Sequence, residues 1–263
     1  MRLTLIVTTY NWKEALKVCL QSAISQAVLP DEIIVADDGS GEDTARVVEE
    51  IQEVSPVPLL HSWQKDKGFR LARSRNRAIA KASGDYIVLI DGDILLHRDF
   101  IGDHRYFAAR SCFSQGTRVL LNENFTKQVL RNGTAGEISA FSPGLGNRKN
   151  CIRIESRLAR YVSRKNKKLS GIRTCNFAFW REDAIMVNGF NEEFIGWGRE
   201  DSEFTARLMN SGVCRQNIRF NAVVYHLFHP MNNRERLENN NAILRRTVEG
   251  RHCWCRHGLR QHL

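Results

Sequence analysis

The clearest candidate for a metal-binding site in this sequence is a pair of aspartates on either side of one glycine. Asp91-Gly92-Asp93 directly follows the apolar run at residues 86–90. Carboxylates at this spacing can converge on one divalent cation, and the glycine lets a bulky ligand approach the backbone. A hard cation with few protein ligands completes its shell with substrate phosphates. The triplet therefore predicts a metal site for a phosphate-bearing ligand, although short acidic triplets also arise by chance.

A second acidic cluster lies far downstream, in Gly196-Trp197-Gly198-Arg199-Glu200-Asp201-Ser202-Glu203. The glycines and the tryptophan predict a mobile loop with an exposed indole, followed by a helix whose first turn is acidic. A sugar ring can stack on the flat apolar face of an indole. The alternative is an ordinary acidic helix N-terminus beside a core tryptophan.

A histidine pair follows the apolar segment at residues 221–225, with His226 directly after it and His229 close behind. An imidazole at a strand end can bind a transition metal and would favour manganese over magnesium. A lone histidine is more often structural, so this prediction depends on the acidic sites.

The elements that must position these residues alternate along the first half of the chain. Short apolar runs at residues 3–8, 32–36, 57–61 and 86–90 predict strands, and residues 13–26, 42–53 and 70–82 show helical periodicity. This alternation predicts an α/β fold with a mostly parallel central sheet and flanking helices on both faces. Ligands bind beyond the carboxyl ends of such strands. Polar clusters stand at three of these ends, where turns and helix caps are the alternative for any single one: 8–11, 37–40 and 91–93.

Composition narrows the class of protein. The chain has 263 residues, of which 42% are hydrophobic and 26% charged, which is typical of a globular protein. No apolar run approaches the roughly 18 residues that a membrane crossing needs. The seven cysteines are scattered and odd in number, which is not the pattern of a secreted disulfide framework. We therefore expect the cytosol as the compartment.

The net charge of +10 indicates an anionic partner, which could be nucleic acid, anionic lipid or a phosphorylated substrate. The basic charge is dense between residues 148 and 173, and the periodicity predicts a basic amphipathic helix over 151–165. Such a helix either lies on an anionic membrane surface or packs on the core as a solvated helix. We expect no nucleic acid, because no zinc-finger, RNA-motif or helix-turn-helix signature is present. The basic face would hold Arg153, Arg157, Arg160 and Arg164.

The ordered set of motifs resembles the family 2 glycosyltransferases of the GT-A fold. It consists of residues 8–11, 37–40, 91–93 and 196–201. The C-terminal half resembles the galactosyltransferase-type C-terminal region, through residues 176–181 and 188–191. The resemblance runs from residue 3 to residue 230. Within the family, it is strongest to bacterial enzymes that extend lipopolysaccharide or lipooligosaccharide cores.

The resemblance implies a role for each matching residue. The donor nucleoside would be contacted by Thr8, Tyr10 and Asp38, with Asp37 nearby. The nucleotide and its phosphates would also be held by Asp66, Arg70 and Asn76. Asp91, next to Gly92, would contact the ribose or the metal shell, while Asp93 and His226 would bind Mn²⁺ or Mg²⁺. Asp201 would be the catalytic base, and Trp197 and Glu200 would bind the acceptor.

The resemblance also implies a reaction. We expect inverting transfer of a hexose or N-acetylhexosamine from a UDP-sugar to a hydroxyl of a glycan or glycolipid acceptor, the lipopolysaccharide or lipooligosaccharide core. A transferase for capsule or another surface polysaccharide is the alternative, and an inactive binding protein on the same fold is another. The glycine-rich, basic segment 116–146 departs from the family pattern and leaves the acceptor open.

The expected organisation follows from the same resemblance. Residues 1–110 would bind the nucleotide-sugar, residues 111–230 would bind the acceptor and carry catalysis, and residues 231–263 would form a helical, basic tail. Within that tail, residues 252–257 are expected to be disordered and not a soft-metal site. The expected place is the cytoplasm, with peripheral contact at the inner face of the inner membrane.

Overall fold

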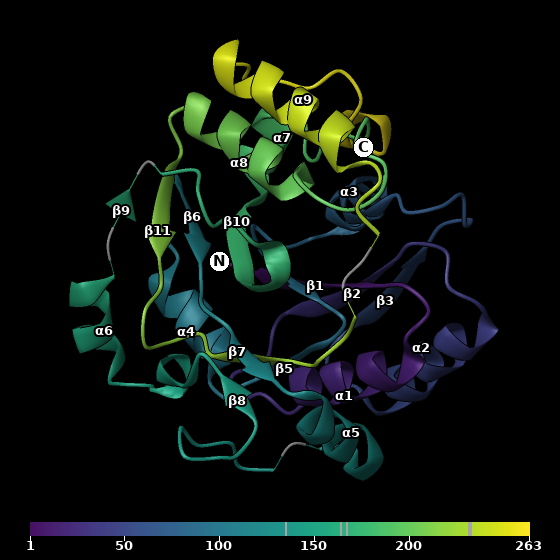
Figure 1. Ribbon diagram of the computed structural model, residues 1–263, viewed down its shortest axis with the longest axis vertical. Helices are drawn as coiled ribbons and strands as arrows, with labels where there is room; N and C mark the ends of the chain where they lie inside the picture. Colours follow the sequence, from purple (N-terminus) through teal and green to yellow (C-terminus); the bar gives the residue numbers. More distant parts are fainter. Residues whose placement is uncertain (135, 164, 167, 231–232) are drawn as a thin grey trace.

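The computed structural model describes residues 1–134, 136–163, 165–166, 168–230 and 233–263 (Figure 1). A mixed eight-stranded sheet forms its centre, with the strand order β3-β2-β1-β4-β10-β6-β11-β9. The strands of this sheet are β1 Leu3–Thr9, β2 Glu32–Asp37, β3 Leu59–Trp63, β4 Tyr86–Asp91, β6 Cys112–Gln115, β9 Lys165–Asn166, β10 Phe177–Trp180 and β11 Cys214–Asn217.

A smaller sheet with the order β5-β12-β7-β8 lies beside the first. Its strands are β5 Ile94–Leu96, β7 Val119–Leu121, β8 Leu145–Gly146 and β12 Val224–His226. The helices are α1 Lys13–Ile24, α2 Glu42–Val54, α3 Leu71–Lys81, α4 Phe100–Phe107, α5 Glu123–Asn132, α6 Ser156–Val162, α7 Arg181–Met186, α8 Glu200–Asn210 and α9 Leu237–Glu249. Three 3₁₀ turns cover Arg148–Cys151, Thr174–Asn176 and Leu259–Gln261.

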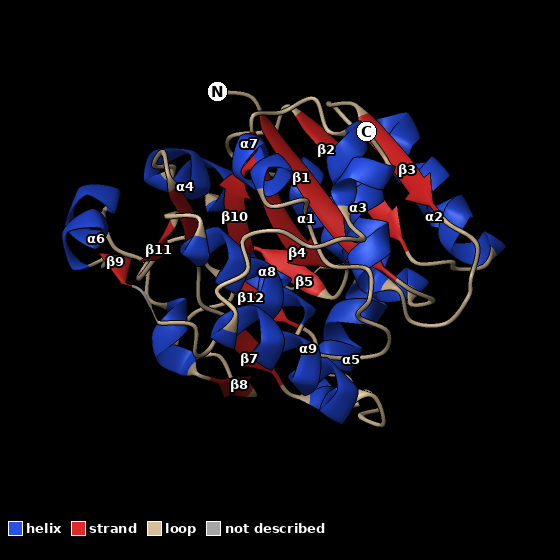
Figure 2. Ribbon diagram, turned by 90° about the horizontal axis from the view of Figure 1, so that it is seen from above, coloured by secondary structure: helices blue, strands red, loops and turns tan. Residues whose placement is uncertain are grey.

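The large sheet is buried on both faces. Successive residues of β1 point to opposite sides, so Leu5 joins the cluster containing Leu16 of α1, while Ile6 joins the cluster containing Ile79 of α3. Figure 2 shows helices on both faces. The predicted α/β class is therefore confirmed. The sheet is parallel from β3 to β4 and becomes mixed where β10 runs antiparallel between β4 and β6.

The predicted strands and helices of the first half are present, with small shifts at their ends. The largest shift is at β3, which begins at Leu59 and not at residue 57. Pro58 has no amide hydrogen and supplies only its carbonyl, to the amide of Ile33. The strand pairing with β2 therefore starts one residue after it.

The predicted basic helix over 151–165 is wrong in extent, because α6 covers only Ser156–Val162. Arg153 turns inward, where its Nη2 lies 2.7 Å from Oδ1 of the buried Asp103 and its Nε lies 3.1 Å from Oδ2. A buried carboxylate requires such a partner. Arg153 therefore neutralises a buried carboxylate, while 30% of its own side chain stays exposed. Arg164 lies outside the described residues.

The expected disorder of residues 252–257 is also wrong. Cys255 and Leu259 are buried, and Asn188 donates a hydrogen bond from Nδ2 to the carbonyl of Cys255 at 2.8 Å. The amide of Arg260 donates in turn to Oδ1 of Asn188 at 2.7 Å. These contacts fix the segment between α3 and α7. Cys253 is exposed, so it does not face the same environment as Cys255.

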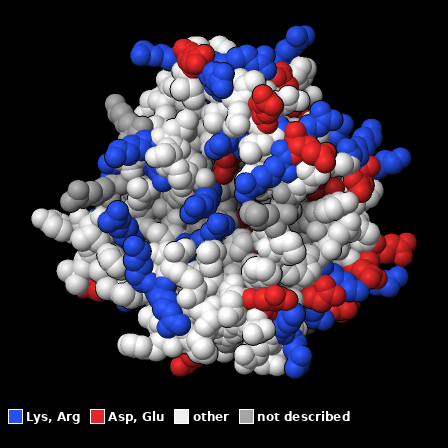
Figure 3. Space-filling model, viewed as in Figure 1, with Lys and Arg blue, Asp and Glu red and all other residues white. Residues whose placement is uncertain are grey.

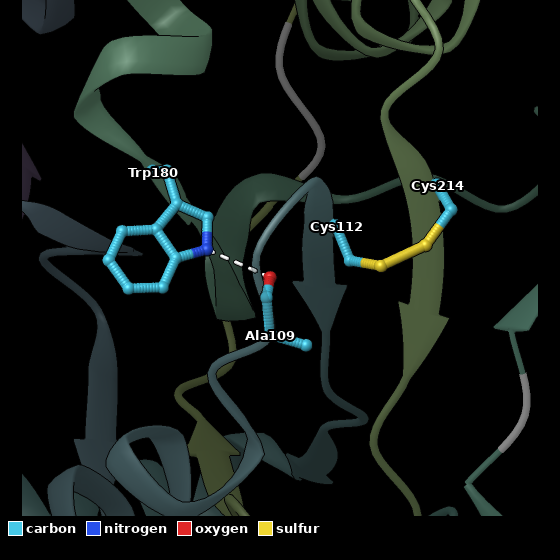
Figure 4. The surroundings of a disulfide bond; sticks show 4 residues. All are labelled: Ala109, Cys112, Trp180 and Cys214. Atoms are coloured by element: carbon cyan, nitrogen blue, oxygen red, sulfur yellow. Dashed lines mark hydrogen bonds between the residues drawn. A yellow bond between two sulfur atoms is a disulfide. The ribbon is translucent and has the colours of Figure 1, made fainter.

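A disulfide joins Cys112 of β6 to Cys214 of β11, two residues that are direct partners in the strand register (Figure 4). Nearby, the indole nitrogen of Trp180 donates to the carbonyl of Ala109 at 2.8 Å. The cysteine count gave no sign of this pair. In the described part of the chain, no helix combines the length and apolarity that a membrane crossing requires.

Candidate functional site

The carboxyl ends of β1, β2 and β4 meet at one edge of the sheet, as predicted for the polar clusters. The register pairs Thr8 with Asp91, and Oγ1 of Thr8 donates to Oδ1 of Asp91 at 3.0 Å. The amide of Gly92 donates to the carbonyl of Thr8 at 2.6 Å. A Cβ at Gly92 would lie 2.9 Å from that carbonyl oxygen, so this tight turn requires glycine.

Asp93 lies with two histidines. Its Oδ2 is 3.6 Å from Nε2 of His226 and 3.3 Å from Nε2 of His229. The ladder that pairs His226 with Ile94 places β12 beside Asp93, and the amide of Leu227 donates to the carbonyl of Asp93 at 3.0 Å. The sequence favoured His226 over His229, whereas the structure brings both to the carboxylate.

This trio fits a divalent cation. Oδ1 of Asp93 is buried without a hydrogen-bond partner, and one ligand atom from each of the three residues lies within 4.8 Å of the others. Burial, with the repulsion of Asp91, raises the pKa of Asp93 to about 8. Burial lowers the pKa of His226 to about 4, so its imidazole is neutral at pH 7, the form that binds metals. One carboxylate and two imidazoles form a mixed oxygen and nitrogen donor set, which suits a transition-metal ion better than magnesium.

A second polar group surrounds the end of β2. Asp38 accepts hydrogen bonds from Nε2 of Gln64 at 2.6 Å and from the amide of Arg70 at 2.7 Å. Burial raises the pKa of Asp38 to about 6. The hydroxyl of Tyr10, whose side chain is half exposed, donates to Asp66 at 3.0 Å. The structure thus brings together four of the residues that the sequence assigned to the nucleotide.

Asp37 and Asn76 are instead committed to the fold. Asp37 is fully buried, accepts from the amides of Gly39 and Ser40, and contacts Nε2 of His61 at 2.9 Å. Nδ2 of Asn76 donates to the carbonyl of Phe190 at 2.7 Å, and its Oδ1 accepts from the amide of the same residue. Both side chains are therefore engaged by the fold itself, and their expected contacts with the nucleotide stay predictions.

Arg75 is a functional candidate that the sequence did not single out. Its guanidinium is buried, with Nη2 at 3.3 Å from Asp91 Oδ1 and 2.8 Å from Thr174 Oγ1. Its Nη1 lies 3.1 Å from Glu200 Oε1. Arg75 therefore links the end of β4 to the start of α8. Three arginines, Arg70, Arg73 and Arg75, lie within six residues of one another, and the local sequence does not show which of them is buried.

The two acids that open α8 lie in different surroundings. Glu200 is paired with Arg75, and its Oε2 is buried without a partner. Asp201 accepts hydrogen bonds from the amide and hydroxyl of Ser202, at 2.6 and 3.1 Å. Burial and the charge of Glu200 raise the pKa of Asp201 to about 7. A carboxylate that titrates near neutral pH can accept a proton from a hydroxyl.

Trp197 stands on the loop before α8 with 37% of its side chain exposed. The guanidinium carbon of Arg234 lies 5.1 Å from its ring centroid. Nδ2 of Asn240, in α9, lies within hydrogen-bond distance of the carbonyls of Ile195, Trp197 and Gly198. The C-terminal helix therefore holds the loop from behind, and the indole is exposed as the sequence predicts.

Solved structures share this fold. TarS of S. aureus, residues 1–349 in complex with UDP, aligns with a TM-score of 0.61 at 17% identity, over 93% of this chain and 64% of that chain. The mannosyltransferase PcManGT from Pyrobaculum calidifontis, in complex with GDP-Man and Mn²⁺, aligns with a TM-score of 0.58 at 21% identity, over 86% and 56%. The expected GT-A fold is confirmed.

Curated relatives match at the sequence level. The chain is 28% identical over 232 residues to the hyaluronan synthase of Pasteurella multocida and 27% identical over 254 residues to the chondroitin synthase of Escherichia coli. These matches cover 80% and 85% of this chain but 23% and 34% of the relatives. The chain thus spans about a quarter of the first relative and about a third of the second.

Family models match in the places where the sequence motifs lie. The model described as N-terminal domain of galactosyltransferase matches residues 156–230, which agrees with the resemblance of the C-terminal half. The model described as Glycosyl transferase family 2 matches residues 4–185. The chain therefore belongs to glycosyl transferase family 2.

Proposed function

We propose that this protein is a metal-dependent, inverting glycosyltransferase that moves a hexose or N-acetylhexosamine from a UDP-sugar to a glycan hydroxyl. The observation that carries the proposal is the joint placement of two groups. Asp93 lies with His226 and His229 in a metal-binding geometry, and Asp201 stands on the other side of Arg75 with its pKa raised to about 7. Support also comes from the relatives in complex with UDP and with GDP-Man and Mn²⁺.

The donor would bind along the edge beyond β1, β2 and β4. Tyr10, Asp38, Asp66 and Arg70 would hold the nucleoside side, since their polar atoms lie together there. Thr8 would fix Asp91 for contact with the ribose or the metal shell. Asp93, His226 and His229 would hold the cation. A bound divalent cation supplies positive charge that stabilises the leaving diphosphate.

Asp201 would act as the general base. A sugar hydroxyl is a poor nucleophile at neutral pH, and a carboxylate that accepts its proton contributes about 10²- to 10⁴-fold in rate. One base opposite the leaving group gives a single displacement with inversion. Trp197 would stack on the acceptor ring, and the unpartnered Oε2 of Glu200 would accept a bond from an acceptor hydroxyl. This division assigns residues 1–110 to the donor and 111–230 to the acceptor and catalysis, with 231–263 supporting the loop of Trp197.

The proposed acceptor is the lipopolysaccharide or lipooligosaccharide core. A second candidate is another bacterial surface polysaccharide, a reading favoured by the hyaluronan and chondroitin synthases among the relatives. The two are separated by offering core oligosaccharides and polysaccharide oligomers to the same enzyme and donor. Transfer to one class alone selects that acceptor.

We also propose that the protein acts in the cytoplasm, at the inner face of the membrane. The support is the surface around α6, which consists of the exposed residues Lys149, Arg157, Leu158, Arg160 and Tyr161. Leu158 is 60% exposed and Tyr161 is 93% exposed. Figure 3 shows a row of basic side chains on the side of the molecule where α6 lies. Because disulfides are rare in the cytosol, the oxidation state of Cys112 and Cys214 in freshly isolated protein tests this placement.

Calorimetric titration with UDP, in the presence and absence of Mn²⁺, tests the proposed function. Manganese-dependent binding in the wild type that is lost in Asp93→Ala is the expected result. Absence of binding by UDP and by other nucleoside diphosphates under both conditions would sink the transferase proposal.

A further inference from the structure

Arg118 is a cation beside the candidate metal site, and among the described residues no ion pair joins it to a carboxylate. In the described part of the chain, the hydrogen bond of its guanidinium is from Nη1 to the sulfur of Cys175, at 3.7 Å. Its Nε is buried without a partner. A thiol is a weak acceptor, whereas a guanidinium carries five N–H donors in a planar fork. The side chain therefore has binding capacity that these contacts do not use.

The fold places Arg118 against both halves of the site. It directly precedes β7, whose Leu120 is paired in register with the metal-site residue His226. Cys175, at the tip of its guanidinium, follows Thr174, which shares the Nη2 atom of Arg75 with Asp91. The carbonyl of Arg118 accepts a bond from Asn150 at 2.8 Å, so its backbone is also held. Arg118 thus lies near Asp93 and His226 of the candidate metal site, with its guanidinium against Cys175.

Electrostatics agree with this placement. The positive charge of Arg118 lowers the pKa of Asp93 and of His226, although burial has the larger effect on each. Asp93 is close enough to interact with Arg118, yet among the described residues neither Asp93 nor Asp91 forms an ion pair with it. If both carboxylates face a cation, the guanidinium must find its anion elsewhere.

We propose that Arg118 binds an anionic group of the donor beside the metal site, so that the ligand is held by the cation on one side and by a guanidinium on the other. This inference rests on the proposed function. The guanidinium fork matches both phosphate and carboxylate. Two groups of a nucleotide-sugar have this chemistry: the phosphate next to the sugar, and the carboxylate of a donor sugar that is a hexuronic acid.

Calorimetry with Mn²⁺ and four ligands distinguishes the two groups: UMP, UDP, a UDP-hexose and a UDP-hexuronic acid. If Arg118 binds the diphosphate, Arg118→Ala weakens UDP and both UDP-sugars about tenfold or more and leaves UMP unchanged. If it binds the sugar carboxylate, the loss is confined to the UDP-hexuronic acid. Arg118→Lys keeps the charge without the fork and should lie between the wild type and Arg118→Ala.

Arg131→Ala is the matched control, because Arg131 is exposed at the end of α5. This variant should bind all four ligands as the wild type does. A thermal melt of each variant shows whether it is folded, and Arg118→Gln replaces Arg118→Ala if the latter is not. A folded Arg118 variant that binds all four ligands as the wild type does would overturn the inference alone. A wild type that binds none of them would instead overturn the proposed function.

Discussion

Adjacent acids in this site do different work because their neighbours differ. Glu200 forms an ion pair with Arg75, whereas the hydrogen bonds that the described residues donate to the Asp201 side chain come from the amide and hydroxyl of Ser202. A carboxylate held by a guanidinium is a weak base, and one that is buried without a cation keeps its affinity for a proton. This contrast is the physical reason to assign the base to Asp201.

Asp201→Asn tests that assignment, because the amide keeps the shape of the side chain but cannot accept the proton. We expect transfer to fall about 10²-fold or more, with UDP and Mn²⁺ binding within about twofold of the wild type. Transfer assays and calorimetry measure the two quantities separately. Asp183→Asn, on α7, is the control. Loss of nucleotide binding in Asp201→Asn would indicate a structural role.

The pH dependence of transfer follows from the same residue. Asp201 acts as a base only when it is deprotonated, and burial raises its pKa to about 7. The rate at saturating donor and acceptor should therefore rise with pH through about 7 and fall tenfold per unit below it. An acid limb near pH 4 would contradict the assignment, since an ordinary exposed carboxylate titrates there.

At the scale of elements, the turn between β2 and α2 positions the proposed nucleoside contacts. Gly39 has a φ of +102°, and a Cβ there would lie 2.5 Å from the Cα of Asp66. Neither the backbone conformation nor the space tolerates a side chain. The chain segment that carries Asp66 and Arg70 therefore packs directly on this turn.

Gly39→Ala should lower the free energy of unfolding by about 1–3 kcal/mol and weaken UDP binding. Gly41→Ala is a close control, because its φ is −75° and a Cβ there meets nothing within 4 Å. Denaturant unfolding and calorimetry on the two variants check the prediction. Equal behaviour of the two would show that the approach of Asp66 is unimportant.

Arg75 joins two elements that are distant in the sequence, the end of β4 and the start of α8. Arg75→Met should lower the free energy of unfolding by about 3 kcal/mol at pH 7, because it leaves the buried Glu200 and the partly exposed Asp91 without their partner. Removing its charge should also raise the pKa of Asp201 and move the acid limb of the rate to higher pH. Arg73→Met, at a more exposed neighbour, should do neither. An unchanged acid limb in a folded Arg75→Met would separate Arg75 from the base.

At the scale of the whole molecule, the net charge of +10 is distributed unevenly, and the surface around α6 combines basic with apolar side chains. Aromatic and aliphatic side chains that enter a lipid interface, flanked by arginines, favour anionic membranes over nucleic acid. The proposed membrane contact therefore predicts that binding depends on both lipid charge and apolar insertion.

Tyr161→Glu should reduce sedimentation with phosphatidylglycerol vesicles severalfold, because it places a charge where an aromatic ring would insert. Val54→Glu makes the same kind of change on α2, where Val54 is 65% exposed, and should leave vesicle binding as in the wild type. Equal loss in both variants would indicate a general charge effect. No vesicle binding by the wild type would remove the membrane proposal.

Three features could be predicted from the sequence without coordinates: the alternation of strands and helices in the first half, the polar residues at the strand ends, and the family. These features are local: periodicity reports which side of an element is buried, and motif order survives without coordinates. The extent of the basic helix could not be predicted from the sequence. Arg153 lies outside α6 and pairs with Asp103, which lies 50 residues earlier in the chain.

Which polar residues lie together in one site could be learned from the three-dimensional contacts and not from the sequence. In the folded chain, Asp37 and Asn76 are hydrogen-bonded within the fold, and Arg75 is buried between Asp91 and Glu200. His229 and Arg118 lie near Asp93, at the candidate metal site. Each of these outcomes depends on contacts between segments that are far apart in the chain, such as β12 beside β5 and α8 beside α3. A hydrophobic pattern predicts that a residue is buried, but the residues that it contacts depend on how distant segments of the chain pack together.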